Sequence, residues 1–137
     1  MNIKSSGAGP VARFGHSMGY LPTNNGIFIC GGRNDEMCKV NATPFLDDIF
    51  VFLLDQKVWL NVKHTLVSEK IDFMGNQCMT VVTDGNDYEN IIVFGGIANN
   101  VGADKNPDNV QSFLSNTTYL INIAQRSAGL KFKNERD

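Results

Sequence analysis

Short apolar runs separated by polar turn residues recur along the whole chain, and no stretch sustains the 3.6-residue spacing of an amphipathic helix. Runs of this length that alternate or are continuously apolar are typical of β-strands. We expect strands at residues 16–21, 27–30, 49–54 and 58–62, and again at 78–83, 91–94, 119–124 and 130–133. The pattern therefore predicts an all-β chain in which a group of four strands occurs twice.

The second group of strands can be aligned with the first, as expected for a duplicated supersecondary unit. Tight-turn residues such as Asn24-Asn25-Gly26 and Asp84-Gly85-Asn86 predict short hairpins at matching places. The offsets between the two groups are 60, 64 and 69 residues, measured from His16 to Asn76, Ile27 to Ile91 and Phe50 to Tyr119.

A pair of glycines follows the second strand of each unit, Gly31-Gly32 in the first and Gly95-Gly96 in the second. The strands before them are continuously apolar, which predicts burial on both faces, as in four-stranded sheets stacked around an axis. The glycines are expected to take positive φ angles and to allow the close approach of a large neighbour such as Trp59. Neither pair lies in a phosphate-binding motif.

The opening of the first unit contains Arg13 and His16, followed by the double glycine, an aromatic strand with Phe50 and Phe52, and finally Trp59. With these elements in this order, the first unit resembles the kelch repeat. The second unit keeps Gly95, Gly96 and an aromatic residue at Tyr119, but it has no matching Arg and no Trp. This resemblance implies two four-stranded antiparallel blades of a kelch-type β-propeller, with Arg13 and His16 buried and hydrogen-bonded inside the blade.

The expected organisation is an N-terminal extension at 1–9, a first repeat at 10–62, a connection and start of the second repeat at 63–76, and a degenerate second repeat at 77–137. Propellers typically have 4–8 blades. Two blades form a partial propeller, so further blades are expected from a longer parent chain, from copies of this chain or from another protein.

Composition excludes several classes of protein. The chain has 137 residues, of which 42% are hydrophobic, and its 12 basic and 14 acidic residues give a formal charge of −2. This balance predicts neither a nucleic-acid nor a membrane partner. No apolar run approaches the roughly 18 residues of a membrane helix, the first residues do not resemble a signal peptide, and the three cysteines are dispersed. Cytoplasmic or nuclear localisation is therefore expected.

No catalytic motif stands out. A metal site would need ligands gathered from distant strands, since the chain has only two histidines and three cysteines. His64 is expected in a solvated loop, and Asp47-Asp48 is interpreted as a polar entry to the aromatic strand. We therefore expect no cofactor, no metal and no enzyme activity within this chain.

The unusual length lies in the connections between the second and third strands, at 33–48 and 97–118. In an up-and-down sheet these loops share one end with the connection at 63–76, and long loops on a rigid scaffold commonly carry recognition. The sequence predicts a protein-interaction module. Alternatives are a regulatory or substrate-recruiting kelch region of a larger enzyme, such as a serine/threonine phosphatase or a ubiquitin-ligase adaptor, and a self-assembling propeller piece. The candidate partner-binding residues are Arg33, Asp35, Glu36, Lys39, Asp104, Lys105 and Asp108.

Overall fold

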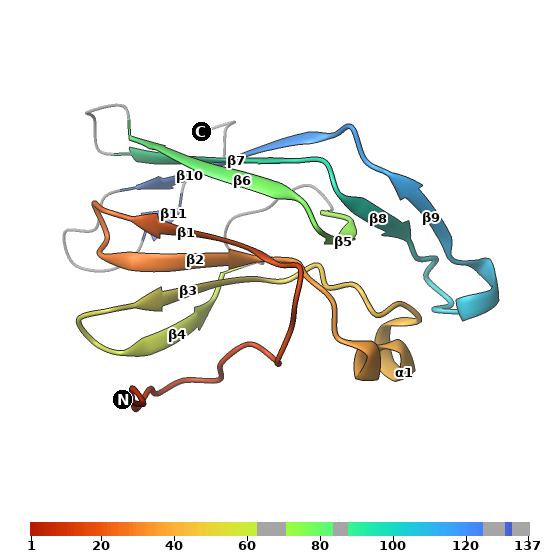
Figure 1. The fold of residues 1–137 in the computed structure, drawn as a ribbon, viewed down its shortest axis with the longest axis horizontal. Coiled ribbons are helices and arrows are strands. Elements are labelled where there is room, and N and C mark those ends of the chain that lie inside the picture. Colours follow the sequence, from red (N-terminus) through yellow and green to blue (C-terminus); the bar gives the residue numbers. More distant parts are fainter. Residues whose placement is uncertain (63–70, 84–87, 125–130, 133–137) are drawn as a thin grey trace.

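The fold is all-β, and its first unit is a four-stranded antiparallel sheet. A computed structural model describes residues 1–62, 71–83, 88–124 and 131–132. The sheet has the order β1-β2-β3-β4, in which each strand pairs with the next along the chain (Figure 1). Its strands are β1 (Ser17–Leu21), β2 (Gly26–Cys30), β3 (Ile49–Leu53) and β4 (Val58–Asn61).

The second unit is also a four-stranded antiparallel sheet, with the order β11-β10-β7-β6. The strands expected in both groups are therefore present, with bounds that shift by only a few residues. The predicted turn at 84–87 and the predicted strand ends at 130 and 133 lie outside the described residues. The strands are β6 (Cys78–Thr83), β7 (Tyr88–Phe94), β10 (Thr118–Ala124) and β11 (Lys131–Phe132).

The connections contain more structure than expected. A third antiparallel sheet, β5-β8-β9, is formed by β5 (Phe73–Gly75), β8 (Ile97–Asn100) and β9 (Gln111–Leu114). The expectation of simple loops at 97–118 and 71–76 was therefore wrong. Gly95 and Gly96, with φ of 80° and 84°, redirect the chain so that it leaves one sheet and enters another at once. Short helical turns are η1 (Asp35–Met37), α1 (Cys38–Asn41) and η2 (Pro107–Asn109).

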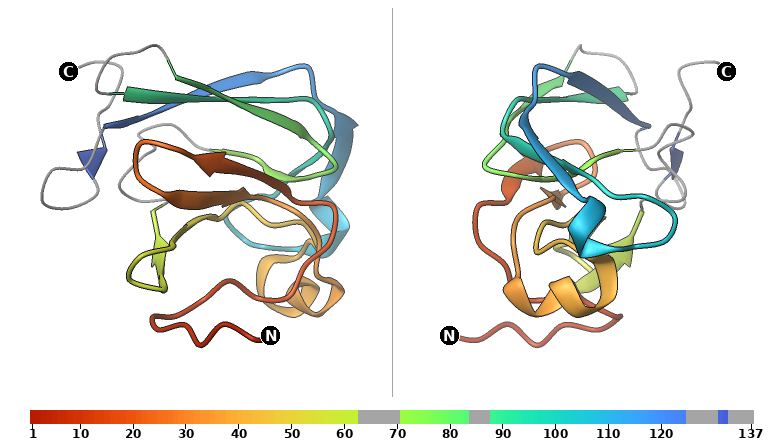
Figure 2. Two further views of the ribbon diagram at one scale, coloured as in Figure 1. Left: turned by 60° about the vertical axis from the view of Figure 1, so that its left-hand side comes forward. Right: turned by 90° about the vertical axis from the view of Figure 1, so that its right-hand side faces the viewer.

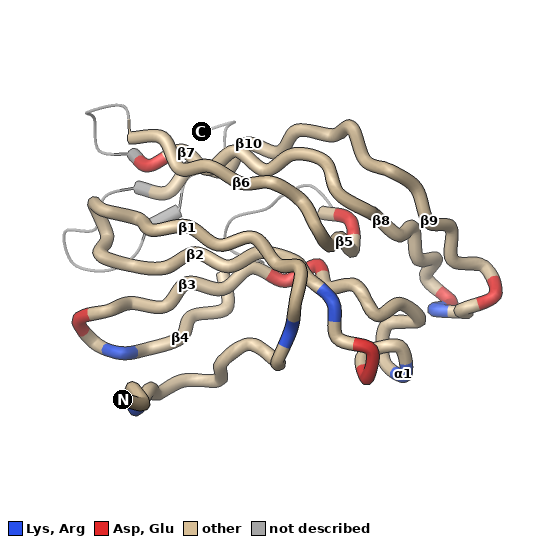
Figure 3. Tube along the Cα trace, in the orientation of Figure 1, with Lys and Arg blue, Asp and Glu red and all other residues tan. Residues whose placement is uncertain are grey.

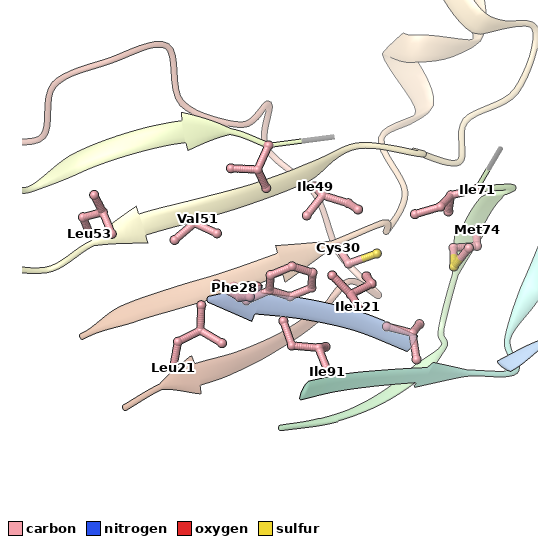
Figure 4. Close-up of a cluster of buried hydrophobic side chains, with 13 residues drawn as sticks. Leu21, Phe28, Cys30, Ile49, Val51, Leu53, Ile71, Met74, Ile91 and Ile121 are labelled. Carbon is pink, nitrogen blue, oxygen red and sulfur yellow. The ribbon is translucent and has the colours of Figure 1, made fainter. Parts of the chain in front are cut away.

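The two four-stranded sheets pack face to face around a single cluster of buried apolar side chains (Figures 2 and 4). Phe28 and Val51 from the first sheet and Ile91 and Ile123 from the second have no exposed surface. The sheets approach closely at β1 and β6, because a Cβ placed on Gly19 would lie 2.6 Å from Met79 Cε. Glycine at this position allows the contact.

Strand pairing corrects one of the three repeat offsets. Ser17 pairs with Cys30 and Cys78 pairs with Phe94, so the first strands align at an offset of 61 residues when the double glycines are aligned. The other two offsets, 64 and 69, agree with the pairing. His16 therefore matches Gln77 instead of Asn76. The contacts of the equivalent glycines support this alignment. A Cβ on Gly32 would lie 3.2 Å from His16 Cα, and a Cβ on Gly96 would lie 3.0 Å from Gln77 Cα.

The prediction that the continuously apolar strands are buried on both faces was wrong. In β2, Phe28 and Cys30 are buried, whereas Ile27 and Ile29 on the other face are only half-buried. In β7, Phe94 is exposed. Each sheet therefore has one face in the shared core and one face on which apolar side chains remain open to solvent.

Candidate partner-binding surface

Arg13, near the start of the first unit, binds the residue that follows β2 and the residue that precedes β3. Its guanidinium donates to both carboxylate oxygens of Asp48, with 2.9 Å between Nη2 and Oδ2, and Nη1 also donates to the Gly31 carbonyl at 3.0 Å. The Arg13 side chain is only 4% exposed. Its Cζ lies 5.8 Å from the centre of the Phe50 ring, within cation–π range. Arg13 therefore has a structural role.

His16 differs from the expectation that its side chain is hydrogen-bonded inside the blade. The residue is half-buried, and its Nδ1 atom is buried without a hydrogen-bond partner among the described residues. Its backbone and Cβ lie against Gly32, where there is no room for a side chain. His16 contributes to this close packing through its main chain.

The double glycines have the expected positive φ angles, 65° and 105° at Gly31 and Gly32. Their close neighbours, however, are not Trp59. A Cβ on Gly31 would lie 2.6 Å from the Nε2 atom of Gln77 and 2.8 Å from the Met74 carbonyl oxygen. The glycines thus join the two units to each other, a role that the sequence did not indicate.

Trp59 packs instead beneath the N-terminal segment, where a Cβ on Gly9 would lie 3.2 Å from its ring. Its ring also contacts those of Phe52 and Phe50, with centroids 4.8 and 6.3 Å apart. Tyr119, which takes the position of Phe50 in the second unit, faces the core and donates a hydrogen bond to Asp72 Oδ2 at 3.1 Å. Burial raises the pKa of Tyr119.

The connections at 33–48 and 97–118 lie at the same end of the molecule, away from the short β1–β2 and β3–β4 hairpins (Figure 1). A buried hydrogen bond joins them, in which Asn99 Nδ2 donates to Thr43 Oγ1 at 2.6 Å. Within the second connection, Ser112, which is exposed, donates from Oγ to Asn99 Oδ1 at 2.7 Å. Thr43 is fully buried and Asn99 is 5% exposed. We call the surface formed by the two joined connections the loop platform.

The backbone of the first connection is held to both β5 and the N-terminal segment. Gly32 donates to the Met74 carbonyl at 2.8 Å, Met74 donates to the Leu46 carbonyl at 3.0 Å, and Arg33 and Phe14 exchange two backbone hydrogen bonds. The inner side of the loop platform is therefore held by backbone hydrogen bonds, of which those between Gly32, Leu46 and Met74 join buried residues.

Four candidate residues of the first connection form two ion pairs on the outer side of the loop platform. Arg33 Nε lies 2.6 Å from Asp35 Oδ1, and Lys39 Nζ lies 3.3 Å from Glu36 Oε2. The side chains of Glu36 and Lys39 are more than four-fifths exposed. Arg33 also stacks on Phe45, at 5.6 Å from the ring centre. These charges are locally paired but accessible. Figure 3 shows where charged residues lie along the Cα trace.

The candidates of the second connection surround η2. Asp104 Oδ1 accepts a hydrogen bond from the Asn106 backbone at 3.1 Å, which gives this carboxylate a role in shaping the turn. Lys105 has a positive φ of 49°. Asp108 lies within η2, and its backbone N–H donates at 3.0 Å to the side chain of Asn106, which caps η2. All three candidates are exposed.

The buried polar residues that build the platform were missed by the sequence reasoning. Thr43 and Asn99 stand in polar stretches that resemble ordinary loops, and nothing in their spacing indicates that they meet. Glu89 was missed in the same way. It is fully buried, and its Oε1 accepts from the backbone of Thr23 and Asn24 in the β1–β2 hairpin.

Within the described residues, no group of three potential metal ligands comes together, and no helix is long and apolar enough to cross a bilayer. His64 lies outside the described residues. Burial raises the pKa of Cys30 to about 12, whereas Cys38 and Cys78 are exposed.

Two face-packed antiparallel meanders with a loop platform at one end thus define an all-β protein. In comparisons with known proteins, no family model matches the chain, and no curated protein matches it significantly.

Proposed function

We propose that this chain is a protein-interaction module built from two kelch-type propeller blades, and that the loop platform binds its partner. The observation that carries the proposal is the joining of the two long connections through the buried hydrogen bond between Thr43 and Asn99. Loops that only tolerate extra length have no need of a buried hydrogen bond between them. A surface that is fixed from below loses less conformational entropy when a partner binds.

Support for the kelch-type interpretation comes from the residues of the resemblance and their contacts. Arg13, Asp48 and Gly31 form one hydrogen-bonded group, and Trp59 covers the aromatic strand from the outer edge of the sheet. The stacking of one four-stranded meander on another is also the arrangement expected of neighbouring propeller blades.

The exposed charges of the platform indicate a polar partner surface. Arg33, Asp35, Glu36 and Lys39 present both signs of charge within a short segment, so they favour a partner with complementary charges over one with a uniform field. We propose a protein partner, no cofactor, no metal and no catalysis by this chain, and a location in the cytoplasm or nucleus.

The proposal is tested by quantitative affinity capture from cells with the wild-type protein and the triple variant Arg33→Ala, Asp35→Ala and Glu36→Ala. Proteins enriched by the wild type are expected to fall at least about tenfold with the triple variant, since loss of a few central contacts commonly costs this much. The matched control carries Asp55→Asn and Lys57→Gly in the hairpin at the opposite end. An unchanged set of captured proteins with the triple variant, or a wild type that captures nothing specific, would refute the proposal.

A further inference from the structure

The open face of the second sheet carries apolar side chains at the register positions of core residues in the first sheet. Using the strand offsets of 61, 64 and 69, Val82 corresponds to Leu21, Phe94 to Cys30 and Leu120 to Val51. The three residues of the first sheet are 0%, 1% and 0% exposed, whereas their counterparts in the second sheet are 45%, 50% and 48% exposed.

The converse relation holds on the first sheet. Its open face carries Met18, Tyr20, Ile27 and Ile29, and the first two are 56% and 52% exposed. Their counterparts in the second sheet all face the shared core. These counterparts are Met79, Val81, Ile91 and Val93, of which the last two are 0% and 1% exposed.

The two sheets are therefore stacked head to tail. In a stack related by a twofold axis, equivalent faces would pack against each other and both ends would be alike. In this chain the core face of the first sheet packs against the face of the second sheet that corresponds to the open face of the first. The open faces at the two ends of the stack are therefore of different kinds. Interfaces of this heterologous type can continue to further units.

We propose that a second copy of this chain docks head to tail, with the open face of its first sheet on the open face of the second sheet. The inference rests on the repeat interpretation given above and names a partner for surfaces other than the loop platform. The contact between the two sheets of one chain serves as its template. At the described positions of β1 to β4, β6, β7 and β10, both open faces lack Lys, Arg, Asp and Glu, so no charge on these strands opposes burial. In the edge strand β11, Lys131 pairs with Ala124 and therefore occupies a register position on the open face of the second sheet.

The available parts of the two open faces match each other in position. The N-terminal segment covers the outer half of the first sheet, where Ser6 hydrogen-bonds with β4 and Gly9 meets Trp59. The inner half, with Met18 and Tyr20 on β1, stays uncovered. Within the chain, β1 lies close to β6, so the inner strands are also where a second copy would make its nearest contact.

Sedimentation velocity under reducing conditions, from about 1 to about 300 μM, covers the range of moderate and weak homodimers. We expect mass to rise with concentration from 15.1 kDa to multiples of it. Leu120→Asp on one open face and Tyr20→Asp on the other should each weaken association at least about 30-fold, as for residues central to an interface. Val40→Asp is the matched control, because Val40 is 60% exposed on α1 and lies on neither open face.

Mixing the two variants separates a head-to-tail contact from a symmetric one. Each variant keeps one intact face, so the mixture should form a 1:1 heterodimer with wild-type affinity that grows no further. Circular dichroism and thermal melting establish that both variants are folded. A wild type that stays monomeric over the whole range overturns the proposal, and so does a mixture of folded variants that fails to associate. Neither result affects the capture experiment, whose variants lie in the loop platform.

Discussion

Replacing Arg13 with alanine should destabilise the protein more than any other change of a single charged residue near the loop platform. The substitution removes the donors that satisfy both oxygens of Asp48 and the carbonyl of Gly31, and it removes the cation that packs on Phe50. The Arg13 side chain is 4% exposed, so water does not replace these contacts in the folded protein without a rearrangement.

The magnitude follows from the burial of the two partners. Breaking a fully buried ion pair by removing one member costs about 3–5 kcal/mol, chiefly because the other charge is left uncompensated. The Asp48 side chain is 23% exposed, so solvent recovers part of this loss. We therefore expect Arg13→Ala to lower the free energy of unfolding by about 2–4 kcal/mol.

Urea denaturation followed by circular dichroism measures this loss, with Arg33→Ala as the matched control. Arg33 also forms an ion pair and stacks on an aromatic ring, but it is 42% exposed and its partner Asp35 is 68% exposed. Its replacement should cost less than about 1 kcal/mol. The double variant Arg13→Ala, Asp48→Ala should lose less free energy of unfolding than the two single variants lose together. The difference, which is the coupling energy of the pair, should be about 1–3 kcal/mol. The reasoning fails when Arg13→Ala and Arg33→Ala cost the same, or when the coupling is zero.

Three further outcomes are expected. Glu89→Ala leaves two backbone N–H groups of the β1–β2 hairpin without their acceptor, so a urea titration should show a loss of about 2 kcal/mol, and an unchanged midpoint would contradict it. Gly32→Ala should lower the free energy of unfolding by more than about 2 kcal/mol, because φ is 105° and the new Cβ would lie 2.9 Å from His16 Cβ. The control Gly102→Ala should change the free energy of unfolding by no more than about 0.5 kcal/mol. Because burial raises the pKa of Cys30 to about 12, we expect iodoacetamide at pH 8 to label exposed Cys38 in the native protein and Cys30 only in urea. Mass spectrometry measures the labelling of each cysteine, and rapid labelling of Cys30 in the native protein would contradict this expectation.

The strands could be predicted because their signal is local. The apolar runs at 27–30 and 91–94 and the turn at Asn24-Asn25-Gly26 mark their positions by residue type alone. The side on which each run is buried could not be predicted in this way. Ile27 and Phe28 are equally apolar, and only the packing of one sheet on the other decides that Phe28 is buried while Ile27 is half-buried.

The charged residues of the loop platform could be named from the sequence, but its construction could not. Arg33 and Asp35 are recognisable as loop charges wherever they lie. The contact between Thr43 and Asn99 spans 56 residues of sequence and depends on β8 leaving the second sheet at Gly95-Gly96. The glycines were recognised, but the new direction of the chain after them depends on the pairing of β8 with β5 and β9.

The two proposed interactions use different surfaces and are therefore compatible. A head-to-tail contact covers the broad faces of the sheets, at Tyr20 and Leu120, whereas the loop platform lies at the ends of the strands. A head-to-tail contact relates each copy to the next by the same rotation, which keeps all loop platforms at the same end of the assembly. Every added copy would therefore bring its own Arg33–Lys39 segment alongside that of the previous copy. A partner with repeated contact sites would then bind an assembly more tightly than a single chain, by raising the effective concentration at the second site. Leu120→Asp should consequently weaken capture of such a partner while leaving the affinity of each individual platform unchanged.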